Sequence, residues 1–244
     1  MPETTVLTPV AVRSRLALAL DTDDLVEALR LAEELEPWFS VAKVGLELYS
    51  AEGPEAVSAL VERGWKVFLD LKLHDIPNTV AGAVRSATQA GASLLTIHAT
   101  GGAAMMSAAA EAASAPGSPR LLAVTVLTSM DANELAGIGI TASPAEQVLR
   151  LEKLAQASGI DGMVCSAEEV ATLRKETSPN TLLVIPGIRP TGSAIEDQKR
   201  IATPARAIHD GASMLVVGRP ITRAQDPAQA AQAILEEIEQ ATTN

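Results

Sequence analysis

Residues 16–23 of the chain read LALALDTD, and this stretch decides the fold. Its first five residues are a short apolar run, which is typical of a strand buried on both faces. Asp21, Thr22 and Asp23 follow with side-chain oxygens that can cap a helix, and an amphipathic stretch runs over residues 23–36. A strand that leads directly into a helix predicts a parallel sheet covered by helices.

The same unit recurs along the whole chain. Pro follows a capping side chain at Ser143-Pro144, Thr203-Pro204 and Asp226-Pro227, which is typical of a helix start. We predict strands over residues 16–20, 41–45, 66–72, 94–98, 121–127, 162–165, 182–186 and 214–217. We predict helices near residues 23–36, 53–63, 79–90, 102–114, 144–158, 167–175, 203–210 and 227–240.

Eight such units in 244 residues predict an α/β fold, a single-domain (β/α)8 TIM barrel. The alternative is an open, doubly wound sheet. It is disfavoured because G-x-G-x-x-G is missing after the first strand, where the chain reads Leu20-Asp21-Thr22-Asp23. No linker rich in Pro, Gly or Ser divides the sequence. We therefore assign residues 15–244 to one catalytic barrel domain and residues 1–14 to an N-terminal extension.

Composition argues against several classes of protein. One Cys and three scattered His provide no metal-ligand spacing, so we expect no metal site and a reducing compartment. A formal net charge of −11 with 2% aromatic residues argues against binding of nucleic acid. The sequence shows neither a signal-peptide pattern nor an apolar run long enough to span a membrane, so we expect a cytoplasmic protein with no membrane partner.

Polar residues recur where the predicted strands end, which is the edge of a barrel that carries chemistry. In the segment FLDLKLHD, residues 68–75, Asp70 and Lys72 share a face with Phe68 because side chains alternate along a strand. A structural ion pair is one interpretation of these two charges. With Lys43 and Asp75 nearby, we instead expect two Lys and two Asp to converge on one pocket, where they can position a proton donor.

The segments after the last two strands suggest an anion site. Pro186-Gly187-Ile188-Arg189 and Gly218-Arg219 combine glycines, which let backbone N–H groups approach a ligand, with guanidinium groups. This region of a barrel frequently binds phosphate. The alternative is that both Arg side chains are solvated surface groups and the glycines only serve turns.

Residues 70–79, DLKLHDIPNT, resemble the D-x-K-x-x-D-I-P-N-T signature of the orotidine 5′-phosphate decarboxylase family. The resemblance covers about residues 15–235 and includes further matches in the family's order. These are Ala19-Leu20-Asp21, Lys43-Val44-Gly45, VTVLTSM at 124–130, PGIRP at 186–190, Asp197-Gln198 and VGRPIT at 217–222.

The resemblance implies cofactor-free decarboxylation of orotidine 5′-phosphate to UMP in pyrimidine synthesis. Lys72 would donate the proton to C6, and Asp70 would lie beside the substrate carboxylate. Lys43 and Asp21 would hold ribose hydroxyls and the charge network. An ammonium held at C6 suits this reaction, since loss of CO₂ leaves a carbanion that no adjacent carbonyl delocalises.

The resemblance also implies a homodimer with shared active sites. Asp75, Ile76 and Thr79 would reach into the partner subunit's site. Thr128, with Ser129 as an alternative, would face the pyrimidine edge, and Gln198 would bridge base and phosphate within a lid over residues 187–200. The phosphate end would consist of Pro186, Arg189, Gly218 and Arg219.

Two other functions stay open at this point. One is a magnesium-dependent sugar-phosphate decarboxylase or aldolase of the same superfamily, but Lys43 stands on the strand where those enzymes carry an acidic metal ligand. The other is a non-catalytic barrel that binds a phosphate ligand, which gives no reason for Lys72 beside Asp70. We expect a supporting role for His98, no chemical role for His74, a buried Cys165, and core or interface packing for Met105-Met106.

Overall fold

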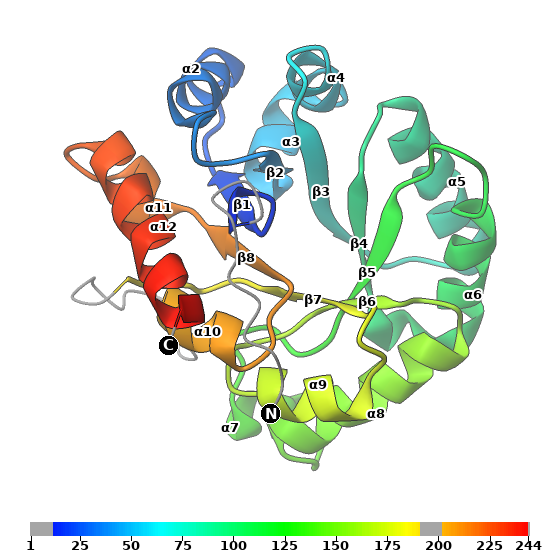
Figure 1. The fold of residues 1–244 in the computed structure, drawn as a ribbon. Coiled ribbons are helices and arrows are strands. Elements are labelled where there is room, and N and C mark those ends of the chain that lie inside the picture. The colour runs from blue at the N-terminus through cyan, green and yellow to red at the C-terminus, as the bar shows by residue number, and fades with distance from the viewer. Residues whose placement is uncertain (1–11, 191–201, 244) are drawn as a thin grey trace.

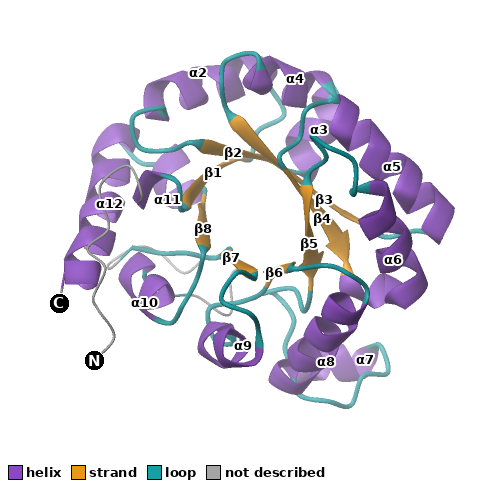
Figure 2. Cartoon of the chain, turned by 45° about the vertical axis from the view of Figure 1, so that its right-hand side comes forward, coloured by secondary structure: helices purple, strands orange, loops and turns teal. Residues whose placement is uncertain are grey.

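Eight parallel strands follow one another around a closed barrel in the computed structural model, which describes residues 12–190 and 202–243 (Figure 1). Each strand pairs with the next along the chain, and β1 closes the ring by pairing with β8. Figure 2 shows this ring with the helices outside it. The strands are β1 (Leu16–Leu20), β2 (Val41–Val44), β3 (Lys66–Leu73), β4 (Leu94–His98), β5 (Arg120–Val124), β6 (Gly162–Val164), β7 (Leu182–Ile185) and β8 (Met214–Val217). The predicted (β/α)8 barrel is confirmed.

The helices include several that the sequence pattern did not predict. The α3, α7 and α11 helices and the turn η1 are each seven residues or shorter, too short for a clear helical period. The strand predicted over 121–127 ends at Val124. The helices are α2 (Leu25–Leu35), α3 (Leu46–Glu52), α4 (Glu55–Val61), α5 (Pro77–Gln89), η1 (Ala99–Gly101), α6 (Gly102–Ala112), α7 (Ala132–Gly137), α8 (Pro144–Ala157), α9 (Val170–Glu176), α10 (Pro204–His209), α11 (Arg219–Thr222) and α12 (Pro227–Thr243).

The helices begin at the capping residues that the sequence predicts, except that the cap of α2 lies one residue later. Ser143 and Thr203 accept backbone hydrogen bonds at the starts of α8 and α10. The α2 helix is capped by Asp24, whose carboxylate accepts a hydrogen bond from the Val26 N–H at 2.8 Å. The prediction that residues 21–23 supply this cap is therefore wrong by one residue. As a consequence, Asp21 is not engaged in capping and extends from the end of β1.

The apolar core has two parts that the strands separate. One fills the barrel interior and includes Phe68, Val184 and Val216, and the other lies between the strands and the helices. Alternation along β3 places Phe68 inside and Leu69 outside. Met105 and Met106 of α6 are 1% and 0% exposed, which confirms the expected core packing. Within the described ranges, no helix combines the length and apolarity that crossing a membrane requires.

Candidate active site

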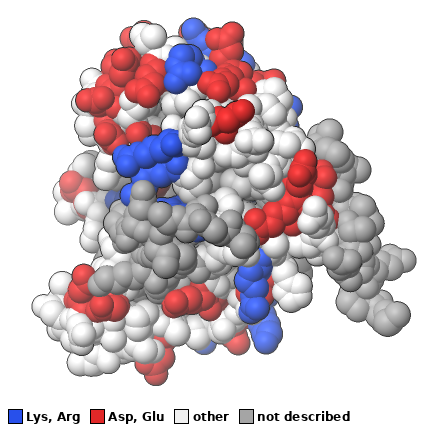
Figure 3. All heavy atoms as spheres, turned by 90° about the vertical axis from the view of Figure 1, so that its left-hand side faces the viewer, with Lys and Arg blue, Asp and Glu red and all other residues white. Residues whose placement is uncertain are grey.

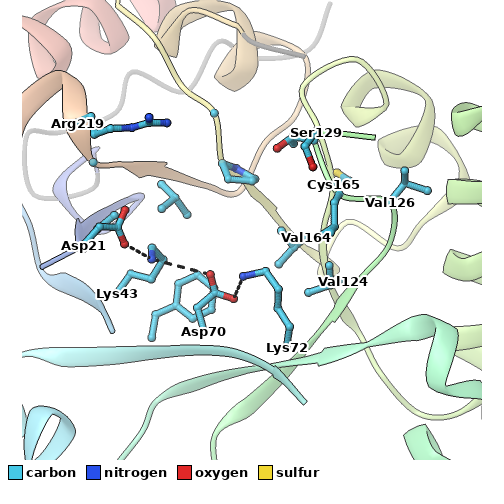
Figure 4. A pocket seen from close by; sticks show the side chains of 18 of the residues that line it. Asp21, Lys43, Asp70, Lys72, Val124, Val126, Ser129, Val164, Cys165 and Arg219 are labelled. Carbon is cyan, nitrogen blue, oxygen red and sulfur yellow. Dashed lines mark hydrogen bonds and ion pairs between the residues drawn. The ribbon is translucent and has the colours of Figure 1, made fainter. Parts of the chain in front are cut away.

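A pocket of about 330 Å³ opens at the carboxyl ends of the strands (Figure 4). Its lining combines apolar residues of the barrel interior, such as Phe68 and Val216, with charged side chains. The described lining residues are Ala19, Asp21, Lys43, Phe68, Asp70, Lys72, Val124, Val126, Leu127, Thr128, Ser129, Val164, Cys165, Pro186, Gly187, Arg189, Val216, Gly218 and Arg219. The pocket is therefore where a barrel places its chemistry, and most residues singled out from the sequence meet there.

Four charged side chains of alternating sign form a row in this pocket. Lys43 Nζ donates to Asp21 Oδ1 at 2.9 Å and lies 4.0 Å from Asp70 Oδ2. Lys72 Nζ donates to Asp70 Oδ1 at 2.9 Å. The Lys43 and Asp70 side chains are 10% and 15% exposed, whereas Lys72 is 31% exposed and Asp21 47%. Each buried charge has a partner of opposite sign, and Lys72 remains accessible to a ligand.

An irregularity in β3 aims this row into the pocket. Leu69 pairs with Leu95 and Leu73 pairs with Ile97, so three residues of β3 oppose a single residue of β4 between those pairs. Lys72 has a φ of +50°, and in the described part of the chain it is the only residue other than glycine with positive φ. Such a backbone is unfavourable for a lysine by about 1–2 kcal/mol. Strain of this kind is concentrated at functional sites.

Buried Thr96 faces this irregular segment from β4. Its hydroxyl accepts a hydrogen bond from the Lys72 backbone N–H at 2.8 Å and donates one to Asp70 Oδ1 at 2.9 Å. Thr96 could not be recognised from the sequence as a site residue, because a lone threonine in an apolar strand carries no motif. The available signal was its position opposite Asp70 and Lys72 on the neighbouring strand.

The apolar wall of the pocket was also missed from the sequence. Val124, Val164, Cys165 and Val216 line it. Strand alternation could have identified the three valines, whereas it places Cys165, which directly follows Val164, on the opposite face. Cys165 is 1% exposed, as expected for a buried residue, but it lies directly after β6 and faces the pocket. Figure 4 shows Cys165 and Ser129 across the pocket from Asp21.

Two glycines permit the close approaches that the pocket requires. A Cβ at Gly45 would lie 2.9 Å from Lys43 Nζ, so a side chain there would displace the ammonium. A Cβ at Gly218 would lie 3.1 Å from the Cβ of Ala19 and 3.4 Å from Asp21 Oδ2. The absence of a side chain at Gly218 lets the loop after β8 pack against the end of β1, and its absence at Gly45 leaves room for the Lys43 ammonium.

Two further positive side chains, Arg189 and Arg219, line the pocket. Arg189 is 7% exposed, and its Nη1 donates to the Ile188 carbonyl at 3.0 Å, which argues against a solvated surface role. Arg219 begins α11 and lies apart from Lys72 in Figure 4. Acidic side chains are spread over the face drawn in Figure 3, while Lys and Arg occur there in a few separate groups. A site for an anion in a chain of net charge −11 therefore depends on local positive groups.

Some predicted site residues do not line the pocket of their own chain. Asp75, Ile76 and Thr79 are exposed at the start of α5, with Ile76 68% exposed. The Asp75 carboxylate accepts a hydrogen bond from the Ile76 N–H at 2.6 Å. Asp75 thus does not join the Lys and Asp cluster of its own chain, and its contribution from a partner subunit stays a prediction. Gln198, with most of the predicted lid over 187–200, lies outside the described residues.

A stacked pair of imidazoles supports the end of β4. The rings of His74 and His98 lie 5.5 Å apart between centroids. The pKa of His98 is lowered, first by burial and then by the positive charges of His74 and Lys72. His98 also accepts a hydrogen bond from the Thr100 N–H in η1. These contacts lie outside the described pocket lining and fit a supporting role for both imidazoles.

Comparison with known proteins shows similarity over almost the whole chain. The family model described as orotidine 5′-phosphate decarboxylase / HUMPS family matches residues 14–234. A protein of Halorhodospira halophila named orotidine 5′-phosphate decarboxylase is 54% identical, with 92% of this chain and 95% of that protein covered. A Pseudomonas putida protein of the same name is 48% identical, with 93% and 98% covered.

Solved structures show the same similarity in three dimensions. The crystal structure of orotidine 5′-phosphate decarboxylase from Lactobacillus acidophilus matches with a TM-score of 0.80 and 38% identity, covering 92% of this chain and 99% of that one. An uncharacterized conserved protein from Geobacillus kaustophilus matches with a TM-score of 0.78 and 37% identity, covering 91% and 99%.

Proposed function

The chain belongs to the orotidine 5′-phosphate decarboxylase / HUMPS family, and on that premise we infer its activity and the roles of its residues. It is a carboxy-lyase that converts orotidine 5′-phosphate to UMP and CO₂ in pyrimidine biosynthesis. Within the site, the observation that supports this activity is the position of the Lys72 ammonium, which lies 2.9 Å from the Asp70 carboxylate in an accessible pocket. A cytoplasmic location is part of the same proposal.

We assign the proton transfer to Lys72. The bond between C6 and the carboxylate carbon breaks, its electron pair remains on C6, and the Lys72 ammonium donates a proton there. A fixed positive charge at C6 stabilises the developing carbanion before it supplies the proton. Asp70 would face the departing carboxylate, so that loss of CO₂ relieves a repulsion between like charges.

The other residues assigned to the site would provide the binding energy for the substrate. Lys43 and Asp21 would hold the ribose hydroxyls, and Thr128 would face the pyrimidine edge, with Ser129 as the alternative. Gln198 would bridge base and phosphate. The loops after β7 and β8 would hold the phosphate through Pro186, Arg189, Gly218 and Arg219. Binding energy from the phosphate can then favour the decarboxylation step at the far end of the substrate.

We propose a homodimer in which each subunit completes the site of the other. Asp75, Ile76 and Thr79 belong to the same signature as Asp70 and Lys72, yet they are exposed and do not line the pocket of their own chain. Ile76, a large apolar side chain, is 68% exposed. Placing these residues against a second copy would bury Ile76 and bring the Asp75 carboxylate to the partner's Lys72.

The magnesium-dependent alternative conflicts with the position of Lys43. Its ammonium occupies the space between Asp21 and Asp70 and neutralises the carboxylates that a cation would need. No three His, Cys, Asp or Glu side chains form a metal-binding group in the described part of the chain.

The direct test follows the loss of orotidine 5′-phosphate absorbance with EDTA present. We expect the unmodified protein to turn over the substrate, and Lys72→Ala to lower kcat at least about a thousandfold, because it removes the proton donor. Lys66→Ala is the matched control, since Lys66 is exposed at the opposite end of the same strand. No turnover by the unmodified protein, or full turnover by Lys72→Ala, would contradict the assignment.

A further inference from the structure

Thr96 links Asp70 and Lys72 of β3 to each other from the neighbouring strand. Its side chain is 0% exposed, and the described lining of the pocket does not include it. The hydroxyl nevertheless contacts both members of the reactive pair, through the Lys72 backbone N–H at 2.8 Å and through Asp70 Oδ1 at 2.9 Å. Thr96 would therefore act on the reaction through Asp70 and Lys72 rather than on the substrate.

The hydroxyl uses its donor and its acceptor capacity at the same time. A threonine has one proton to donate and lone pairs to accept with. The proton goes to Asp70 Oδ1, the same oxygen that accepts from Lys72 Nζ at 2.9 Å. Two donors on one oxygen fix the plane of the Asp70 carboxylate and leave Oδ2 facing Lys43, 4.0 Å away.

The acceptor side of the hydroxyl explains how the irregular segment of β3 is held. Thr96 is the single residue of β4 that opposes residues 70–72, between the pairs Leu69↔Leu95 and Leu73↔Ile97. In a regular ladder the Lys72 N–H would find a backbone carbonyl. Here Lys72 has a φ of +50°, and the Thr96 hydroxyl takes the place of that carbonyl. The backbone that directs Lys72 into the pocket thus depends on a side chain.

We propose that Thr96 is a positioning residue for the decarboxylation, whose hydroxyl holds the Lys72 backbone and the Asp70 carboxylate in one geometry. This inference rests on the proposed function. Without the hydroxyl, the Lys72 N–H and one side of Asp70 Oδ1 lose their partner, and the ammonium no longer has a fixed position relative to C6. A displacement of about 1 Å in a reacting group can reduce a rate by about a hundredfold.

The test compares Thr96→Val, which removes the hydroxyl at nearly constant volume, with Thr96→Ser, which keeps it. Thr177→Val is the matched control. Thr177 is also buried, at 8% exposed, and its hydroxyl donates to the Leu173 carbonyl at 2.8 Å, at the end of α9. Thr96→Ala is a second variant without the hydroxyl, so the result does not depend on the folding of one protein. We would measure kcat, KM, the Kd for UMP and the Tm of each variant.

We expect Thr96→Val and Thr96→Ala to lower kcat about 10-fold to 100-fold, with the Kd for UMP changed less than about threefold. Thr96→Ser should keep at least about a third of kcat, and Thr177→Val should lower Tm without lowering kcat. The proposal fails if kcat falls less than tenfold without the hydroxyl, if Thr177→Val loses as much, or if UMP binding weakens in parallel with kcat. Absence of turnover in the unmodified protein would instead overturn the proposed function itself.

Discussion

At the scale of single residues, the defining feature of the pocket is the short distance between its charged side chains. Asp70 faces Lys72 with one oxygen and Lys43 with the other, and Lys43 in turn reaches Asp21. None of these residues lies on a flexible connection, since Lys43, Asp70 and Lys72 belong to strands and Asp21 directly follows one. Preorganised charge of this kind needs no reorganisation during the reaction, which is the main electrostatic contribution to catalysis.

The space beside Lys43 gives a prediction for Gly45. In Gly45→Ala the new Cβ would lie 2.9 Å from Lys43 Nζ, so the ammonium must move away from Asp21. Because Nζ ends a flexible side chain, this movement should change Tm by less than about 2 °C while lowering kcat/KM about 10-fold or more. Steady-state kinetics and thermal unfolding check both quantities.

Gly137→Ala is the control for that substitution. Gly137 ends α7, and a Cβ there would meet nothing within 4 Å. It should leave both quantities unchanged. If kcat/KM of the Gly45→Ala protein equals that of the unmodified protein, catalysis does not depend on the position of the Lys43 ammonium.

At the scale of elements, the strands were predicted more completely than the helices. A buried strand shows as an apolar run, and a helix start as a capping side chain before Pro, so β1, β8, α8 and α10 followed from local sequence. The short helices α3, α7 and α11 did not, because one or two turns contain too few residues for a period. The irregularity in β3 was not predicted for another reason: it is determined by the pairing of β3 with β4 and not by the sequence of β3 alone.

The α8 helix carries a buried acid with an unusual titration. Glu152 is 1% exposed, and its Oε1 finds no hydrogen-bond partner among the described residues. Burial raises the pKa of the Glu152 carboxyl; Lys153 opposes this shift more weakly, and Glu176 adds to it. The folded state disfavours the charged carboxylate. Glu152 therefore lowers the free energy of unfolding progressively as the pH rises above the ordinary pKa of a glutamate carboxyl.

Glu152→Gln should therefore raise the free energy of unfolding at pH 7 by about 1 kcal/mol, because it removes the charge at constant size. The gain should shrink towards pH 4, where the carboxyl of the unmodified protein is protonated in both states. Urea unfolding at the two pH values measures this difference. Glu62→Gln, at an exposed position after α4, is the control, and an equal effect of both substitutions would contradict a role for burial.

At the scale of the whole molecule, the residues of one signature lie in two separate places. Asp70 and Lys72 enter the pocket, whereas Asp75, Ile76 and Thr79 lie on the surface. Reasoning from residue types placed Asp75 with the other charges, because sequence proximity does not reveal where a strand ends and the chain turns. A functional unit with more than one copy of the chain would explain why the surface residues share a signature with the pocket residues.

Mixed dimers test this division. When Lys72→Ala and Asp75→Ala proteins are mixed and exchange subunits, each hybrid has one site with both residues intact and one with neither. Random pairing should restore about a quarter of the unmodified activity per site, since about half of the dimers are hybrids with one working site each. Activity is measured after exchange is verified by mass spectrometry of a tagged subunit.

The control mixture pairs Asp75→Ala with a protein that carries both substitutions. No hybrid of these two contains an intact site, so no activity should return. If the first mixture also stays inactive after complete exchange, the sites are not shared.

Closure of the barrel between β1 and β8 has a consequence for biosynthesis. Asp21 follows the first strand and Arg219 follows the last, and these strands pair directly. During translation, 198 further residues must be synthesised after Asp21 before Arg219 is present. Contacts of such long range form slowly, and domains generally fold as units during synthesis. The pocket is thus complete only after β8 has been synthesised, because Val216, Gly218 and Arg219 belong to its lining. A truncated chain that ends before β8 lacks these residues, so substrate should protect it less against proteolysis than it protects the full chain.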